Sequence, residues 1–266
     1  MKILLFGDDW GLPMLLHHIP NENICGIIGA SIRPAQKKFL IELSKKYNLP
    51  FFMQPKKLDQ RYVNFKKFVR DLSPDMILVN SYSMIIRDDI LEITKFKINI
   101  HGGLLPEYRG CNPIEWSIIN REEYAGVTIH EMTSSLDEGN IIDRVTVPIE
   151  FTDTWIDVRK KLHRKTDIMI KNFVDKALLG NWTSRKQESE LANYYSRRSA
   201  DDGLFSWEES VIDIYNKIRA LVDPHPGAFF INKKEEKVVF NQFLSIFDVL
   251  CIKYDYLREK INYKHS

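Results

Sequence analysis

The first half of the chain repeats one pattern, in which a short apolar run is followed by a longer amphipathic stretch. The apolar runs are KILLFG, NICGIIGA, PFFMQ and MILVNSY, each with the length of a buried strand. The stretches between them include PAQKKFLIELSKKYN and QRYVNFKKFVRDL, which have helical spacing. Strands that alternate with helices form βαβ units around a parallel sheet. The pattern therefore predicts an α/β fold with a mostly parallel sheet and helices on both faces.

The pattern changes after Asn99. Two strand-like segments, residues 126–132 and 140–149, are joined by the loop TSSLDEG. A long helix is expected next, because Thr154 and Asp157 form a capping-box pattern and Gly180 is a natural C-terminal stop. Its expected apolar stripe is Trp155, Val158, Leu162, Met169, Phe173 and Ala177.

Residues 181–193 are polar and predict a linker. Beyond them, WEESVIDIYNKIRALV is amphipathic and predicts a helix. The segments GAFFIN and KVVFNQFLSI, together with the last residues of the chain, predict strands. We therefore expect a main domain over residues 1–185 and a small β-rich C-terminal module over residues 186–266.

Charge and composition narrow the possible functions. A formal net charge of +2 gives no global electrostatic basis for nucleic-acid binding. The N-terminal apolar run of five residues is too short for a signal peptide, and no later run reaches membrane-spanning length. We expect a cytoplasmic protein with no membrane partner. Cys25, Cys111 and Cys251 are odd in number and widely spaced, which predicts reduced thiols, and the scattered histidines predict no metal site.

The stretch INIHGGLLPEYRG carries the residues best suited to chemistry. Asn99 and His101 project from one face at the end of a strand, where open α/β sheets bind ligands. Gly102 and Gly103 leave the backbone bare beside them. An amide can stabilise a developing oxyanion by about 3 kcal/mol, and an imidazole can shuttle a proton. No Ser or Cys nucleophile is adjacent, which favours direct acyl transfer between two bound substrates, although a single strand-end His is more often structural.

Longer segments, NIHGGLLPEYRGCNPIEWSIIN and AGVTIHEMTSSLDEGNII, closely resemble the folate-dependent formyltransferase family. That family includes methionyl-tRNA, glycinamide ribonucleotide and sugar N-formyltransferases. The resemblance implies a Rossmann-like domain, N10-formyltetrahydrofolate as the formyl donor, and a catalytic trio of Asn99, His101 and Asp137. It also implies that Asn99 stabilises the oxyanion, that His101 manages the protons, and that Asp137 raises the pKa of His101. By itself, Asp137 is equally well explained as a turn residue.

The folate pocket of this family is largely apolar and lined by backbone, and NSYSMII matches one of its walls. The loop over residues 133–137 matches the other wall. The residues that the resemblance assigns to the cofactor are Ser83, Met84, Ile85, Ile86, Thr133 and Asp137. Met84 and Ile86 are expected to pack on the pterin, although core packing explains any one of these side chains about as well.

Three classes of acceptor occur among the resembling proteins. The purine enzyme usually has a single domain, so the extra C-terminal module argues against it. The tRNA enzyme has a longer basic loop than ASIRPAQKKF, and the near-balanced charge also disfavours tRNA. The segments YYSRRSADDGLFSW and IRALVDPHPGAFF resemble the sugar enzymes. The expected acceptor is therefore a nucleotide-linked amino sugar, most specifically a dTDP-linked 4-amino-4,6-dideoxyhexose for O-antigen or a related glycan.

The residues expected to contact the acceptor lie in the first turn, in the glycine loop and near the C-terminal module. The first turn, GDDWG, is not a glycine-rich phosphate cradle, because its acids would repel phosphate. Asp9 could contact sugar hydroxyls or cap a helix, and Trp10 could pack on the sugar or base. Many relatives have His-Pro-Ser where this chain has His-Gly-Gly, which suggests an acceptor that needs more room. The expected substrate-binding residues are Asp9, Trp10, Gly102, Gly103, Arg197 and Arg198, with the two arginines as phosphate ligands or as solvated surface charges.

Alternatives remain open at this point. The first is a methionyl-tRNA formyltransferase, and the second is a non-enzymatic folate- or nucleotide-binding module, which would not need the trio. An NAD-dependent oxidoreductase is disfavoured because GDDWGL lacks the G-x-G-x-x-G pattern. The C-terminal module is rich in aromatic and β-branched residues, which predicts either that they form a core within one chain or that part of them forms a homodimer interface. These residues are Phe229, Phe230, Val238, Val239, Phe240, Phe243, Ile246 and Phe247.

Overall fold

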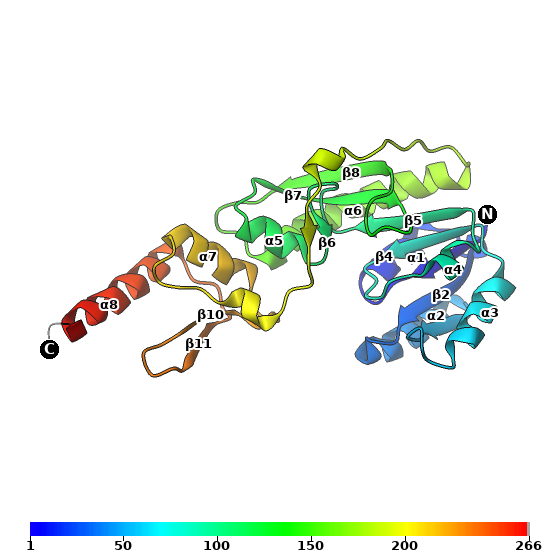
Figure 1. Cartoon of the computed structure of the whole chain (residues 1–266). Helices are drawn as coiled ribbons and strands as arrows, with labels where there is room; N and C mark the ends of the chain where they lie inside the picture. The colour runs from blue at the N-terminus through cyan, green and yellow to red at the C-terminus, as the bar shows by residue number, and fades with distance from the viewer. Residues whose placement is uncertain (265–266) are drawn as a thin grey trace. The chain divides into compact units, whose positions relative to one another are not determined.

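A seven-stranded sheet organises the first part of the chain (Figure 1), in a computed structural model that describes residues 1–264. The strand order is β3-β2-β1-β4-β5-β7-β8. Every pair from β3 to β5 is parallel, and β7 runs antiparallel to β5. The strands are β1 Ile3–Phe6, β2 Ile24–Ala30, β3 Phe51–Gln54, β4 Met76–Asn80, β5 Phe96–His101, β7 Tyr124–Glu131 and β8 Ile141–Pro148. The predicted α/β fold with a mostly parallel sheet is confirmed.

Helices connect these strands and continue beyond them. The α-helices are α1 Gly11–His18, α2 Lys37–Tyr47, α3 Tyr62–Leu72, α4 Asp88–Leu91, α5 Pro113–Ile119, α6 Trp155–Leu178, α7 Val211–Ala220 and α8 Ile246–Lys264. Short 3-10 turns are Asn21–Asn23, Pro34–Gln36, Ser189–Leu191 and Ala200–Gly203. Two small sheets pair β6 Arg109–Gly110 with β9 Tyr194–Tyr195, and β10 Ala228–Ile231 with β11 Lys237–Phe240. Within residues 1–264, no helix combines the length and the apolar character needed to cross a membrane.

The long helix α6 begins and ends where the sequence predicts. The Thr154 N–H donates to Asp157 Oδ2 at 3.1 Å, and the Asp157 N–H donates back to Thr154 Oγ1 at 3.4 Å, which completes the capping box. Gly180 follows the helix at φ +67°, a conformation that glycine adopts without strain. All six residues of the predicted apolar stripe are buried. Packing of that stripe, rather than local propensity, supplies most of the stability of such a helix.

The end of the chain differs from the prediction. The last residues were expected as strands, but residues 246–264 form α8. The Ser245 N–H donates to Asp248 Oδ2 at 2.9 Å, and the Asp248 N–H donates to Ser245 Oγ at 3.1 Å. This reciprocal cap starts a helix in a segment whose aromatic and β-branched residues favour strand by propensity alone.

The chain divides into two compact units that differ from the predicted domains. The first comprises residues 1–107, 127–145 and 165–192, and the second comprises residues 108–126, 146–164 and 193–266. The predicted boundary at residue 185 stays a prediction. The polar stretch after α6 is not a free linker, because Trp182 packs against Phe96 with ring centroids 4.7 Å apart.

Candidate active site

The end of β5 brings Asn99 and His101 into a cluster with His130 and Asp137, which we call the polar centre of the first unit. In the β5–β7 register, Asn99 lies opposite His130 and His101 lies opposite Thr128. The Asn99 Nδ2–H donates to His130 Nε2 at 3.1 Å. The His130 Nδ1–H donates to the Glu131 carbonyl oxygen at 2.7 Å, which leaves Nε2 as the acceptor. The imidazole of His130 thus fixes the orientation of the Asn99 amide.

Asp137 completes the predicted trio from the loop between β7 and β8. Its Oδ2 lies 3.7 Å from His101 Nδ1, and its Oδ1 lies 3.5 Å from His130 Nε2. All three side chains are buried. A buried carboxylate between two imidazoles can orient both rings. The structure therefore brings Asn99, His101 and Asp137 together and adds His130 to them.

Sequence patterns alone do not point to His130. The alternation in GVTIHEM predicts that His130 lies on a strand, but it does not identify the strand that pairs with it. The antiparallel β5–β7 register supplies that information. Only a prediction of this pairing would have placed His130 opposite Asn99.

The loop that carries Asp137 has an unusual backbone. Asp137 adopts φ +55°, a left-handed conformation that few non-glycine residues occupy. A Cβ atom on Gly139 would lie 1.8 Å from the Glu131 carbonyl oxygen, so only glycine fits there. The side chain of Gln187 donates to the carbonyl oxygens of Asp137 and Gly139 at 2.8 and 2.7 Å. Thr133 Oγ1 closes the start of this loop by donating to the Ser135 carbonyl oxygen at 3.1 Å.

The glycine loop after His101 is held by buried polar groups. Thr128 Oγ1 donates to the Gly103 carbonyl oxygen at 2.7 Å and accepts from the Leu105 N–H at 3.1 Å. Arg144 Nη1 donates to the Leu105 carbonyl oxygen at 3.0 Å. Gly103 is buried, whereas Gly102 is exposed. The bare backbone beside His101 therefore has a defined shape.

Asp8 fixes the predicted folate wall from the sheet side. It is 3% exposed, and its two carboxylate oxygens accept the Ala30 N–H at 2.7 Å and the Ser83 N–H at 2.8 Å. Its own N–H donates to the Ser81 carbonyl oxygen at 3.2 Å. Ser81 adopts φ +55°, so the chain turns sharply at the end of β4.

Gln54 holds the same wall from β3. It is 3% exposed, its Nε2 donates to the Ile85 carbonyl oxygen at 3.0 Å, and its Oε1 accepts the Tyr82 hydroxyl at 2.8 Å. Burial, with a smaller contribution from the Asp8 charge, raises the pKa of Tyr82 well above its usual range, so that hydroxyl stays a donor. Asp8 and Gln54 together therefore hold this wall at Ser81, Tyr82, Ser83 and Ile85.

The side chains of this wall point to different environments. Ile86 belongs to a buried apolar cluster with Phe65 and Ile90, and its predicted contact with a pterin stays a prediction. Met84 is half-buried, and Ile85 is 75% exposed. Asp9 Oδ1 accepts the Gly11 N–H at 3.3 Å at the start of α1, and Trp10 beside it is half-buried. Asp9 thus binds the backbone in the turn before α1, whose N-cap residue is Trp10.

The two predicted phosphate ligands lie in the second unit. Arg197 is exposed and Arg198 is half-buried. Nε and Nη1 of Arg198 are buried without a hydrogen-bond partner, and its guanidinium lies 6.0 Å from the Trp116 ring centroid. Burial lowers the pKa of Arg198, against the opposing effect of Glu115 and Asp202. Unpaired guanidinium nitrogens of this kind attract an anion.

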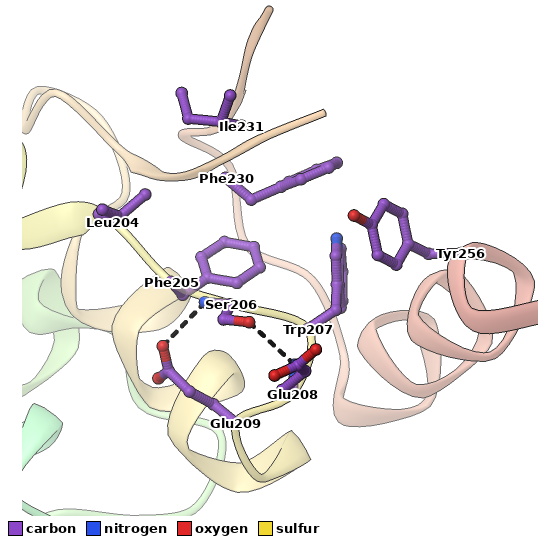
Figure 2. Close-up of a pocket in the computed structure, with 9 residues that line it drawn as sticks. All are labelled: Leu204, Phe205, Ser206, Trp207, Glu208, Glu209, Phe230, Ile231 and Tyr256. Atoms are coloured by element: carbon purple, nitrogen blue, oxygen red, sulfur yellow. Dashed lines mark hydrogen bonds between the residues drawn. The ribbon is translucent and has the colours of Figure 1, made fainter. Parts of the chain in front are cut away.

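A cavity of about 470 Å³ also lies in the second unit (Figure 2). Its lining is Leu204, Phe205, Ser206, Trp207, Glu208, Glu209, Phe230, Ile231 and Tyr256. The Trp207 ring packs on Phe205 and Phe230 with centroids 5.1 and 5.3 Å apart, which is aromatic core packing. The Glu209 carboxylate already binds Lys217 Nζ at 2.8 Å. No predicted site residue lines this cavity.

Within residues 1–264, no group of three or more His, Cys, Asp or Glu side chains is arranged to hold a metal ion. The three cysteines are free thiols, as their spacing predicts.

Known proteins resemble this chain in both sequence and fold. The bifunctional polymyxin resistance protein ArnA of Wigglesworthia glossinidia brevipalpis is 36% identical over 187 residues, which are 70% of this chain and 28% of that protein. The chain therefore spans little more than a quarter of the length of this curated relative.

Solved structures share the fold at lower identity. A 4-N formyltransferase from Francisella tularensis has a TM-score of 0.73 at 22% identity, covering 92% of this chain and 98% of its own. A sugar N-formyltransferase from a Shewanella species has a TM-score of 0.74 at 20% identity, with the same coverage. An N-formyltransferase from Helicobacter canadensis, solved with folinic acid and dTDP-3-aminofucose, has a TM-score of 0.68 at 19% identity, covering 88% of this chain and 85% of its own.

Family models match most of the two units. The formyl transferase model matches residues 21–174, and the formyl transferase C-terminal domain model matches residues 198–245. The first match spans β5, β7 and the loop with Asp137, so it contains the whole polar centre. The predicted family resemblance is thereby confirmed, and the chain belongs to the formyl transferase family.

Proposed function

We propose that this chain transfers a formyl group from N10-formyltetrahydrofolate to the amino group of a nucleotide-linked amino sugar. One observation carries it: Asn99, His101 and Asp137 converge in the buried polar centre of a formyl transferase family member. Direct transfer fits this centre, because the trio contains no Ser or Cys nucleophile of the kind that commonly carries an acyl group.

Each residue of the trio has a distinct role in the proposed reaction. The folate co-substrate supplies an activated formyl group bound to its N10 nitrogen. As the acceptor nitrogen bonds to the formyl carbon, Asn99 donates its second amide hydrogen to the formyl oxygen, where negative charge develops. His101 takes the proton from the acceptor nitrogen and delivers it to N10 as the bond between carbon and N10 breaks. Asp137, 3.7 Å away, stabilises the imidazolium that carries the proton.

The residues beside β4 fit a folate. The segment over residues 81–86 offers backbone groups together with Met84 and the exposed Ile85, and Asp8 and Gln54 hold it in one shape. Ligand sites are typically apolar with a few fixed polar groups. Thr133 and Asp137 form the facing wall in this proposal.

A nucleotide sugar is the proposed acceptor because of what the structural relatives contain. The Helicobacter canadensis enzyme was solved with dTDP-3-aminofucose, and WlaRD is described as a sugar 3N-formyl transferase with dTDP. The Francisella tularensis relative is a 4-N formyltransferase. Our specific proposal for the acceptor is a dTDP-4-amino-4,6-dideoxyhexose. We also propose that the reaction takes place in the cytoplasm and serves the synthesis of O-antigen or a related glycan.

Arg198 is the proposed ligand of the nucleotide diphosphate, with Arg197 beside it. The unpaired nitrogens of Arg198 support this role. For the sugar itself we propose Asp9, Trp10 and the bare Gly102–Gly103 backbone.

A homodimer is the proposed assembly, and α8 is its proposed interface. Phe247, Leu250 and Tyr254 lie on one helical face and are 69%, 50% and 66% exposed. Of the residues expected from the sequence, Phe229 and Phe230 are instead buried. An apolar helical stripe is well covered by the same stripe of a second copy, and two-fold dimers are the commonest homo-oligomers.

Mass spectrometry tests the proposed reaction. The enzyme is incubated with N10-formyltetrahydrofolate and a panel of nucleotide amino sugars, with methionyl-tRNA and glycinamide ribonucleotide included. A gain of ~28 Da on one amino sugar, which depends on Asn99, supports the proposal. Formylation of methionyl-tRNA instead would establish the tRNA alternative, and folate binding without any product would leave a binding module.

A further inference from the structure

The stretch that follows α6 contacts the loop that carries Asp137. We call residues 182–187 the strap. Trp182 anchors its start between Phe96 and Phe173, with ring centroids 4.7 and 6.2 Å away. Arg185 then exchanges both backbone hydrogen bonds with Ile141 at 2.8 Å each. The strap therefore extends the sheet edge immediately after the Asp137 loop.

Gln187 ends the strap and is 6% exposed. Its Nε2 donates one hydrogen to the Asp137 carbonyl oxygen at 2.8 Å and one to the Gly139 carbonyl oxygen at 2.7 Å. An amide nitrogen has two hydrogens, so both are used on carbonyls two residues apart. No other type of uncharged side chain of this length supplies two such donors.

The two bonds from Gln187 hold a backbone segment whose conformation is unfavourable by itself. Asp137 holds φ +55°, a conformation that persists only where its surroundings over-determine it. Gly139 packs its backbone against Glu131 on the other side. The loop is thus fixed from both sides, and the Asp137 carboxylate that emerges from it reaches His101 and His130 at 3.7 and 3.5 Å.

We propose that Gln187 is a positioning residue of the formyl-transfer site, which acts by holding the backbone of Asp137 so that its carboxylate meets His101. The inference rests on the proposed function for its catalytic readout. Misplacing a catalytic group by about 1 Å commonly costs on the order of 100-fold in rate. Both amide hydrogens of Gln187 are donated to backbone carbonyl oxygens, so its loss should act on turnover rather than on substrate binding.

Gln187→Met is the informative variant, because methionine keeps the length and removes both donors. We expect kcat to fall about 10- to 100-fold, with both KM values within about twofold of wild type. Gln187→Glu is the second variant, since its carboxylate would face two carbonyl oxygens, and it should lose at least as much.

A double-mutant cycle separates positioning from general damage. In an Asp137→Asn background, Gln187→Met should lower kcat by less than about twofold, because its effect passes through Asp137. Gln54→Met is the matched control, since it removes another buried amide in the same unit. It should raise the KM for the folate by a similar factor in both backgrounds, because Gln54 holds the Ile85 side of the wall.

Hydrogen exchange provides a readout that needs no substrate. The peptide over residues 133–141 should exchange faster in Gln187→Met than in wild type, at temperatures well below both melting transitions. Unchanged exchange, or equal kcat losses from Gln187→Met in both backgrounds, would overturn the positioning role. If the wild type formylates nothing in the substrate panel, the proposed function fails, and faster exchange would then still support the hold on the Asp137 loop.

Discussion

Replacing Asp8 by asparagine probes the interior hydrogen bonds beneath the folate wall. The two carboxylate oxygens of Asp8 accept two buried N–H groups, from Ala30 and Ser83. Asparagine has the same shape but only one oxygen, so its NH2 group would face one of these donors. A hydrogen bond to a charged group is worth about 1.5–3 kcal/mol, and an unsatisfied buried N–H costs about 1–3 kcal/mol. We expect the free energy of unfolding to fall by about 3 kcal/mol.

Thermal unfolding measures this loss. For a chain of this size, 1 kcal/mol shifts Tm by roughly 2–4 °C, so the Asp8→Asn variant should melt about 6–12 °C lower. Asp75→Asn is the control, because Asp75 also accepts a backbone N–H, from Lys2 at 2.7 Å, but is exposed. Its Tm should change by less than about 2 °C.

The same variant connects stability to the site. Because asparagine cannot accept both the Ala30 and the Ser83 N–H, residues 81–86 should be held less firmly. The KM for N10-formyltetrahydrofolate should then rise about tenfold, while the KM for the amino sugar stays within about twofold. A Tm within 2 °C of wild type would refute the assigned strength of the two bonds. An unchanged folate KM despite a lowered Tm would show that the wall does not bind the folate.

Three further outcomes are expected. His101→Ala and Asp137→Ala should each lose at least about 100-fold in kcat with little change in Tm, and near-normal turnover would remove that residue from the mechanism. Burial raises the pKa of Cys25 to about 11, so iodoacetamide at pH 8 should label the exposed Cys251 well before Cys25. Mass spectrometry follows both reactions, and equal labelling rates would contradict the burial of Cys25. Leu250→Lys should convert a dimer to a monomer in light scattering at micromolar concentration, whereas a monomeric wild type would exclude the α8 interface.

The parts of the fold with regular sequence patterns could be predicted. The buried runs of β1, β2 and β4 and the amphipathic spacing of α3 and α6 are local signals, because each element buries one face or both. The end of the chain was wrongly assigned to strands, because its aromatic and β-branched residues favour strand by propensity although the segment forms α8. The Ser245-x-x-Asp248 capping box was the signal that marks α8.

The site was predictable to a smaller extent. The i, i+2 spacing within one strand places Asn99 and His101 on one face, but Asp137 joined them only through the family resemblance. His130 and Gln187 depend on partners far along the chain, β5 for His130 and the 137–139 loop for Gln187. The polar composition of residues 181–193 predicted a linker there. Composition does not show that the amide of Gln187 is buried and donates to two backbone carbonyl oxygens.

The junction between parallel and antiparallel strands explains why the polar centre lies where it does. In the parallel part of the sheet, β4 and β5 both end at the same edge, so the backbone of residues 81–86 and 102–105 lies outside the ladder of the sheet and is bound by side chains instead. The antiparallel β7 runs past the end of β5 and brings Thr128 and His130 to that edge from the opposite direction. Side chains from β7 can therefore bind both the backbone and the side chains at the end of β5, as Thr128 does for Gly103 and His130 does for Asn99. A purely parallel sheet would offer only loops at this edge, and the reversal of one strand replaces part of them with a rigid element.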